Sequence, residues 1–341
     1  LYVTSNALIP PLVEQRMVDW GGFFIPNIQT FTKYGLYTYF NQPPYFLQVV
    51  PNWFFIGNST YPWNLCVLHR AVAMIVNATP MSQIAEMGYI LPCKDPLCIR
   101  GTIYESAWSK YINWTTVQQY GWVLGTYQNN TAAAAQLLES AGFYKGPDGY
   151  WRTPNGTLVT ATIIVPYGWT DSMEDAELLA EQLNAFGIKA TTSFPAAGTE
   201  FNDIYTGEFI IGYLWAWSGV TPYPYFQELM YPTGTNGALV PVGTSTWGDY
   251  GRWYVNGHYI WEVFENLSYV PLTDYEAQQK YFTEIEKAYL ECPPVIPGLL
   301  NAQWYEYSTV YWVGWPNASN PAPVNPPAWS PPQDVINTLN A

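Results

Sequence analysis

The chain has 341 residues, of which 49 % are apolar, 18 % are aromatic and 11 % are charged. This apolar content excludes a disordered chain, and the length allows one large domain or two lobes. The formal net charge of −14 excludes the basic surface that phosphate backbones require, so we expect no nucleic-acid partner. No apolar run of about 18 residues is present, so no segment is predicted to span a membrane.

The first elements predicted in chain order are helices. Residues 1–50 are irregular and aromatic and show no complete α/β unit. Residues 64–76 repeat apolar side chains at helical spacing, which predicts a helix. A second helix is predicted over 79–88, with proline in its first turn and glycine at its end. A third is predicted over 132–141, capped by Thr131.

The clearest pattern is a strand, a helix and a second strand. Residues 158–165 alternate and are β-branched, and residues 188–194 repeat that pattern. Between them, Ser172 and Asp175 resemble a capping box that opens a helix ending at Gly187. This spacing predicts a βαβ unit with two parallel strands. The acidic residues of the helix are interpreted as its solvated face: Glu174, Asp175, Glu177 and Glu181.

The later part of the chain contains further strands. A short helix is expected around residues 200–206, and the unbroken apolar run 209–217 predicts a buried central strand. A capping box of Thr273 and Glu276 opens a helix that reaches about residue 290, and residues 295–300 form a strand candidate. Residues 316–332 are rich in Pro and Asn and predict an extended surface segment.

The four cysteines favour an oxidising compartment. Cys93 and Cys98 bracket a short loop, which is compatible with a disulfide or with half of a metal site. Because the chain has only 2 histidines, the disulfide is favoured and no metal is expected. Cys66 and Cys292 are then the remaining pair, although spacing alone does not determine the connectivity.

Asn-x-Ser/Thr sequons are more numerous than chance predicts. Together with the cysteines and the low charge they favour an extracellular glycoprotein, and the alternative is that an Asn- and Thr-rich chain produces sequons by accident. They begin at Asn58, Asn77, Asn113, Asn129, Asn155, Asn266 and Asn317.

Five motifs occur in an order typical of one protein family. They are His69–Asn77, Ala134–Phe143 with Asp148-Gly149, Tyr213–Trp217 leading to Pro222, Gly251–Gly257, and Tyr281–Glu286 with Pro294–Pro297. Together they resemble the extracellular solute-binding proteins of family 5, over about residues 52–315. Members of this family serve ABC transporters for oligopeptides, dipeptides, nickel and, in several archaea and thermophiles, oligosaccharides.

The resemblance implies an α/β, periplasmic-binding-protein-like (type II) fold with two lobes around a cleft. Because members usually carry many more residues ahead of the first motif, we expect mainly the C-terminal lobe plus segments that return to the other lobe. Residues 1–50 would then be part of the N-terminal lobe or hinge, 51–300 the C-terminal ligand-binding lobe, and 301–341 a return segment with a Pro-rich tail.

The resemblance also implies partners and a location. We expect a small-molecule solute, an ABC-transporter permease and a missing N-terminal portion of the same protein as partners. Leu1 is not an initiator Met and no signal-peptide pattern follows it, so we expect a processed or cut chain whose anchor lies elsewhere. The expected location is extracellular and associated with the cell surface.

One position bears on the ligand. In peptide-binding members an acidic residue follows the strand tryptophan and pairs with the free amino terminus of the ligand. Aligning the tryptophan and the proline places Ser218 there, and a neutral hydroxyl cannot compensate an ammonium that is losing its water. This disfavours a free-amine peptide and favours a neutral oligosaccharide.

Candidate ligand-binding residues follow from this alignment, with burial in the core as the alternative for each aromatic ring. Trp247 and Trp253 lie in Gly-rich loops and are expected at the surface. The candidates are Tyr213, Trp215, Trp217, Ser218, Tyr223, Trp247, Arg252 and Asn256.

Other functions have less support in the sequence. No P-loop, G-x-G-x-x-G or H-E-x-x-H motif occurs and no carboxylate pair is recognisable, so we expect neither an enzyme nor a cofactor. An oligopeptide-binding protein of the same family and a cell-surface glycoprotein without a transport role remain alternatives. Low charge and aromatic richness favour a cell exposed to acid, such as a thermoacidophilic archaeon, because few ion pairs leave little stability to lose when carboxylates protonate.

Overall fold

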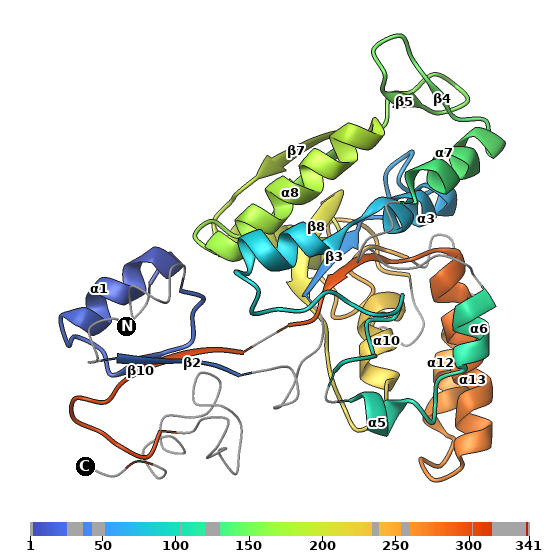
Figure 1. Cartoon of the computed structure of the whole chain (residues 1–341). Coiled ribbons are helices and arrows are strands. Elements are labelled where there is room, and N and C mark those ends of the chain that lie inside the picture. Colours follow the sequence, from blue (N-terminus) through green and yellow to red (C-terminus); the bar gives the residue numbers. More distant parts are fainter. Residues whose placement is uncertain are drawn as a thin grey trace.

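A five-stranded sheet with the order β7-β6-β8-β3-β9 forms the centre of the fold (Figure 1). Parallel pairing joins β6 to β7 and β8, whereas β3 pairs antiparallel with β8 and β9. The strands are β3 (Asn52–Ile56), β6 (Thr160–Ile164), β7 (Lys189–Ser193), β8 (Ile211–Trp215) and β9 (Val295–Leu299). The computed structural model describes residues 3–25, 37–42, 52–102, 104–119, 130–233, 239–253, 260–301, 303–315 and 339.

The predicted βαβ unit is confirmed by β6, α8 (Thr170–Phe186) and β7. Gly187 ends α8 in the left-handed region at φ 105°, as its position in the sequence predicted. The predicted capping box is wrong, because α8 begins before Ser172 and its N-cap, Trp169, makes no side-chain capping bond. Ser172 and Asp175 instead lie inside the helix with both side chains buried. Asp175 therefore does not belong to a solvated face.

β8 is the buried central strand that the apolar run predicted. Its first four residues are buried and Trp215 at its end is half-buried. β3 lies between β8 and β9. β3 was not predicted, because it directly follows the irregular aromatic segment and its five residues do not alternate between apolar and polar.

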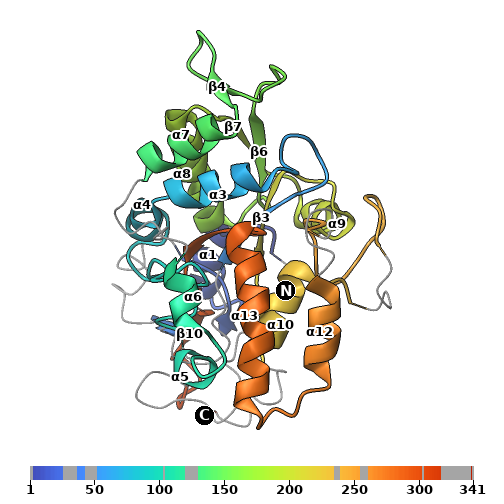
Figure 2. The same ribbon diagram turned by 90° about the vertical axis from the view of Figure 1, so that its right-hand side faces the viewer.

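Helices cover this sheet. Figure 2 shows α13 and α12 side by side with α10 next to them, and α3 beside α7. The predicted helices 64–76, 132–141 and 200–206 are confirmed as α3, α7 and α9. The bounds are α3 (Cys66–Ile75), α5 (Glu105–Trp108), α6 (Trp114–Gln119), α7 (Thr131–Ser140), α9 (Ala197–Thr206), α10 (Tyr223–Met230), α12 (Trp261–Ser268) and α13 (Tyr275–Glu291).

Two predicted helices differ from expectation at their boundaries. The helix predicted over 79–88 consists of α4 (Ala78–Pro80) followed by η2 (Met81–Ala85), with a π-helical turn. The N-cap of α13 is Asp274, whose carboxylate accepts the N–H of Ala277 at 3.1 Å, rather than Thr273. Among the described residues, no helix combines the length and the apolar character that crossing a membrane requires.

A smaller antiparallel sheet joins the two ends of the chain. Its order is β1-β10-β2, with β1 (Trp20–Gly21), β10 (Gln303–Ser308) and β2 (Tyr37–Gln42). Together with η1 (Asn6–Leu8) and α1 (Ile9–Glu14), it lies to one side of the five-stranded sheet (Figure 1). Ile9, Val13 and Ile25 form a separate small core there. The segment predicted to be extended, residues 316–332, lies outside the described residues.

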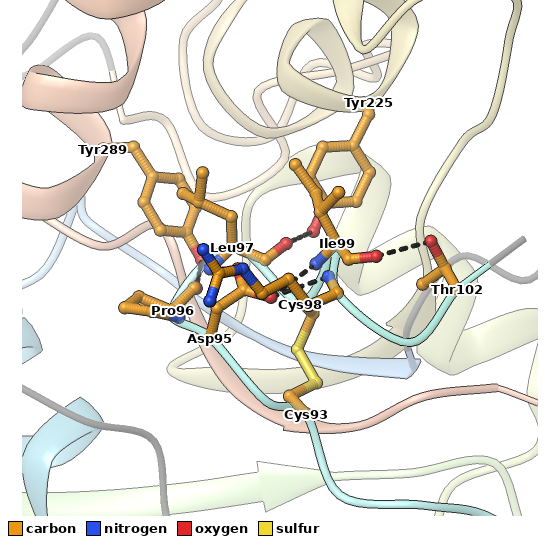
Figure 3. Close-up of a disulfide and its surroundings, with 10 residues drawn as sticks. Cys93, Asp95, Pro96, Leu97, Cys98, Ile99, Thr102, Tyr225 and Tyr289 are labelled. Atoms are coloured by element: carbon orange, nitrogen blue, oxygen red, sulfur yellow. Dashed lines mark hydrogen bonds between the residues drawn. A yellow bond between two sulfur atoms is a disulfide. The ribbon is translucent and has the colours of Figure 1, made fainter. Parts of the chain in front are cut away.

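Both favoured disulfides are present. Cys66 at the start of α3 is bonded to Cys292 just after α13, across a sequence separation of 226. Cys93 and Cys98 close a short loop (Figure 3). Inside that loop the buried carboxylate of Asp95 accepts the backbone N–H groups of Leu97, Ile99 and Arg100 at 2.9, 3.1 and 2.7 Å.

We expect the two disulfides to contribute very differently to stability. A bond that closes a longer loop removes more entropy from the unfolded chain, and the sequence separations are 226 and 5. Replacing both Cys66 and Cys292 by alanine should therefore lower the free energy of unfolding by about 3 kcal/mol more than the same change at Cys93 and Cys98. Urea denaturation of the two double variants measures this difference, and equal losses would contradict it.

Candidate functional site

Six aromatic side chains form a continuous group at one edge of the five-stranded sheet. We call this group the aromatic platform. Trp247 is 59 % exposed and the other members are half-buried. The members are Trp169, Phe201, Tyr205, Trp215, Trp217 and Trp247.

The rings contact one another in sequence across the platform. Trp169 stacks on Trp215 with centroids 6.0 Å apart and an interplanar angle of 26°. Phe201 meets Trp215 edge-on at 5.9 Å and stacks on Tyr205 at 6.3 Å. Offset and edge-to-face contacts at these distances are the favoured arrangements of aromatic pairs.

The other end of the platform is formed by two tryptophans. Trp247 lies 5.3 Å from Tyr205 and 6.4 Å from Trp217, measured between ring centroids. Because the rings overlap in this way, the platform presents a row of flat apolar surfaces rather than separate side chains.

The topology of the sheet explains why these residues meet. Trp169 follows β6, the helix that carries Phe201 and Tyr205 follows β7, and Trp215 ends β8. These three strands run parallel, so their carboxyl ends lie at one edge. In open α/β sheets that edge is where ligands bind.

Sequence analysis missed Trp169, Phe201 and Tyr205. A signal for them was present, because Phe201 and Tyr205 are four residues apart on the short helix α9 and therefore share a face. Trp169 comes directly before a helix that follows a predicted strand. Each could have been assigned to the same sheet edge from the predicted βαβ order.

The predicted ligand-binding residues separate into two groups. Trp215, Trp217 and Ser218 are half-buried, and Trp247 is exposed, so their side chains reach the surface of this chain. Tyr213 does not, because it is only 2 % exposed and packs against the rings of Phe54 and Trp169.

Arg252 is also wholly buried, so the prediction that it contacts a ligand is corrected. Its guanidinium donates to the backbone carbonyls of Tyr205 and Thr244 at 3.1 and 2.7 Å and to those of Asp249 and Tyr250. These bonds stabilise the loop that carries Trp247. A charged group with its donors directed at carbonyls in this way is structural.

Three further positions complete the comparison with the sequence. Tyr223, the first residue of α10, lines a different cavity of about 340 Å³ together with Val220 and Leu272. Trp253, expected at the surface, is buried and donates its indole N–H to the carbonyl of Cys292. Asn256 lies outside the described residues.

The sequons differ in exposure. Asn58 is wholly buried and its side-chain amide donates to the carbonyl of Trp253, so the folded chain cannot carry a glycan there. At the other described sequons, Asn77 and Asn113 are half-buried, whereas Asn155 and Asn266 are exposed. Asn129 and Asn317 lie outside the described residues.

Two buried carboxyl groups lie behind the platform. Glu228 on α10 is wholly buried, and one of its oxygens accepts the backbone N–H of Trp217. Burial raises the pKa of Glu228 well above its ordinary value. Glu200, in the first turn of α9, is also buried, and burial together with the charge of Asp203 raises its pKa to about 9. Burial therefore favours the neutral form of both groups.

Buried carboxyls recur elsewhere in the fold. Within the described part of the chain the ion pairs are exposed: Arg152–Asp148 at 2.7 Å and Lys287–Glu284 at 3.0 Å. Burial is the main cause of the raised pKa of each buried carboxyl. Those outside the platform are Glu86, Asp95, Asp171, Asp175, Glu286 and Glu306.

Three of these carboxyls lie together. In addition to the effect of burial, Asp171 and Asp175 raise the pKa of Glu86, and Asp171 raises the pKa of Asp175. Asn6 donates to Asp171 at 3.1 Å. No set of His, Cys, Asp or Glu side chains in the described ranges is arranged to hold a metal ion.

The mixed sheet with helices on its faces defines the class of protein. It is a type II periplasmic-binding-protein-like α/β fold. The family model described as bacterial extracellular solute-binding proteins, family 5 Middle, matches residues 5–238. The chain belongs to this family. No curated protein matches it.

Solved structures agree with this assignment. A periplasmic oligopeptide-binding protein from Thermotoga maritima with bound mannohexaose is 25 % identical with a TM-score of 0.83, over 100 % of this chain and 61 % of that one. NikZ from Campylobacter jejuni in complex with Ni(L-His) is 14 % identical with a TM-score of 0.71, over 92 % and 56 %. The oligopeptide-binding protein of Bacillus subtilis with a nonapeptide is 12 % identical with a TM-score of 0.71, over 93 % and 57 %. The chain thus spans about three fifths of the length of these relatives.

We expect the free energy of unfolding to fall as the pH rises. For Glu286 the pKa rises from 4.5 to about 8 on folding, so the stability that depends on its neutral form is complete below about pH 4.5 and lost as the pH rises through about 8. Glu286→Gln keeps an acceptor for the N–H of Asn113 but cannot ionise. Urea denaturation at about pH 5 and about pH 8 should show a smaller difference in the variant than in the parent. A parent that is more stable at the higher pH would contradict the expectation.

Proposed function

We propose that the chain carries the ligand-binding surface of an extracellular substrate-binding component of an ABC transporter, which captures a neutral oligosaccharide on the aromatic platform. The observation that carries this proposal is the row of overlapping rings from Trp169 to Trp247 at the carboxyl ends of parallel strands. Membership in the family supports the binding role.

The charges around the platform favour a neutral ligand. Glu200 and Glu228 lie behind the rings as neutral carboxyls and present no anion to an ammonium group. The guanidinium of Arg252 is directed at backbone carbonyls, so it offers no cation to a carboxylate or phosphate. Flat aromatic rings pack well against the C–H faces of pyranose rings, and this contact needs no charge.

One residue of this chain and one related solved structure favour an oligosaccharide over a peptide as the ligand. Ser218 places a neutral hydroxyl where peptide-binding members carry an acidic residue. The Thermotoga maritima protein was solved with mannohexaose. An oligopeptide remains the second candidate, because the Bacillus subtilis protein was solved with a nonapeptide.

The organisation of the whole protein is part of the same proposal. We infer that residues 51–300 form the ligand-binding lobe and that residues 1–50 and 301–341 belong to the other lobe. The pairing of β10 with β1 and β2 supports this division, because it joins the two outer segments in one sheet. The proposed partners are the solute, a permease and a further portion of the same protein. The proposed location is outside the cell at its surface, with Asn155 and Asn266 as exposed glycan acceptors.

We expect Trp217→Ala and Trp247→Ala each to weaken oligosaccharide binding about tenfold, because each removes a flat surface from the platform. Isothermal titration calorimetry with manno-, cello- and malto-oligosaccharides measures the affinity. Tyr269→Ala is the matched control, since Tyr269 is 86 % exposed and lies outside the platform. Unchanged affinity in both tryptophan variants would argue against the platform. A parent that binds neither sugars nor peptides would instead favour a surface glycoprotein without a transport role.

Ser218→Asp tests the choice between sugar and peptide. A carboxylate at this position should create or strengthen binding of a peptide with a free amino terminus, because it can pair with the ammonium group. The same peptide with an acetylated amino terminus is the control and should gain nothing. Equal binding of both peptides would show that Ser218 does not determine the ligand class.

A further inference from the structure

Glu228 is a buried residue of α10 behind the platform. Its side chain extends from α10 to the loop after β8, where one carboxyl oxygen accepts the backbone N–H of Trp217. The other oxygen, Oε1, is buried and has no hydrogen-bond partner within the described residues. The side chain as a whole is 0 % exposed. A carboxyl group in this position is costly, so its contact with Trp217 needs an explanation.

The main chain of Glu228 supports a second platform residue. Its carbonyl accepts the N–H of Asp249 at 2.6 Å. Between Asp249 and Trp247 lies Gly248, which adopts a left-handed φ of 79°. A Cβ atom at Gly248 would lie 2.6 Å from the carbonyl oxygen of Tyr231, so the loop packs against α10 as closely as only glycine allows.

One residue of α10 therefore holds both tryptophans at this end of the platform. Glu228 binds the main chain of Trp217 directly and the main chain beside Trp247 through Asp249. The two indole rings lie 6.4 Å apart. A shift of Glu228 would change the spacing of the surface that they form together.

The N–H of Trp217 favours the ionised form of Glu228, but burial outweighs it and raises the pKa of this carboxyl, and no cation among the described residues faces it. Tyr205, Tyr225 and Tyr250 face it from α9, α10 and the Trp247 loop, and burial together with Glu228 itself raises the pKa of each phenol. Asp249 directs its carboxylate to the N–H of Trp253. Arg252, the nearby cation, donates to backbone carbonyls. If Glu228 lost its proton to solvent, the buried charge would have no ion-pair partner among these groups and would be relieved by opening the loop to water.

We propose that Glu228 is a positioning residue for the platform: its neutral carboxyl holds Trp217 in its binding arrangement beside Trp247, and loss of its proton releases Trp217 and weakens ligand binding. The ligand part of this proposal rests on the proposed function. Because the form with a neutral Glu228 is the one that binds, we expect the affinity for the ligand to fall as the pH rises.

Two substitutions distinguish the effect of the proton on Glu228 from the effect of its side-chain acceptor. Glu228→Gln keeps a carbonyl oxygen for the N–H of Trp217 but cannot ionise. Glu228→Ala removes the acceptor. Glu286→Gln is the matched control, because Glu286 is also buried and also accepts a backbone N–H, that of Asn113, but lies on α13 against α6.

The first measurement needs no ligand. Amide hydrogen exchange, followed by mass spectrometry of the 341-residue chain, reports whether the N–H of Trp217 is protected. We expect protection in the parent and in Glu228→Gln at about pH 5, and loss of protection in Glu228→Ala at the same pH. Glu286→Gln should match the parent at Trp217. Full protection in Glu228→Ala would overturn the positioning role.

The second measurement is the affinity for mannohexaose by calorimetry. We expect the affinity of the parent to fall as the pH rises, by about tenfold once Glu228 has lost its proton, and we expect a smaller change in Glu228→Gln. Glu286→Gln should keep the pH dependence of the parent. If Glu228→Gln shows the same dependence as the parent, the proton on Glu228 is not the cause and the proposal fails.

The two measurements distinguish the possible failures. If the parent binds no oligosaccharide at any pH, the proposed function fails, whereas the exchange data still decide whether Glu228 positions Trp217. If Glu228→Ala does not fold, near-ultraviolet circular dichroism shows it, and the comparison of Glu228→Gln with the parent decides the proposal alone.

Discussion

The parallel pairing of β6 with β7 and β8 is the constraint on which the rest of the structure depends. Because the three strands run in one direction, the segments that leave their carboxyl ends all begin at the same edge of the sheet. Trp169, α9 and the loop after β8 therefore lie together although they are far apart in the sequence. The antiparallel β3 on the other side of β8 buries that strand and makes the edge rigid.

Several acidic side chains of the described residues are buried without a positively charged partner. The chain has 26 acidic and only 12 basic residues. Glu86, Glu200 and Glu228 are buried as neutral acids. Such groups accept and donate hydrogen bonds like amides as long as they keep their protons, and so their contribution to stability depends on the pH.

Elements with a strong local signal were predictable from the sequence. The unbroken apolar run of β8 and the periodic apolar face of α8 were correct, and Gly187 ends α8 because only a residue tolerant of positive φ closes it there. The family resemblance supplied the topology that connects these elements. It made Trp215 and Trp217 ligand candidates, with burial in the core as the alternative, and the Gly-rich loop predicted Trp247 at the surface; in the structure the first two are half-buried and Trp247 is exposed.

The predictions that failed depended on distant contacts. Arg252 is held by carbonyls at positions 205 and 244, and nothing near it in the sequence indicates that these will lie within reach. Tyr213 and Trp215 lie two residues apart and so share one face of β8, but which of the two side chains is open depends on how α8 and α9 pack. Asp175 is different, because it is spaced four residues from Leu179 on the apolar face of α8, and that spacing could have predicted its burial.

Both sheets are completed late in the chain. β9 forms an edge of the five-stranded sheet and β10 lies between β1 and β2 in the smaller one, and these two strands are separated by only residues 300–302. Neither sheet can reach its final hydrogen bonding until this stretch has been synthesised. The pairing of β9 and β10 with strands much earlier in the sequence predicts slow folding dominated by contacts between remote segments. For an exported polypeptide such a delay has a benefit, because a chain that cannot close early stays in a form that a translocation channel can accept.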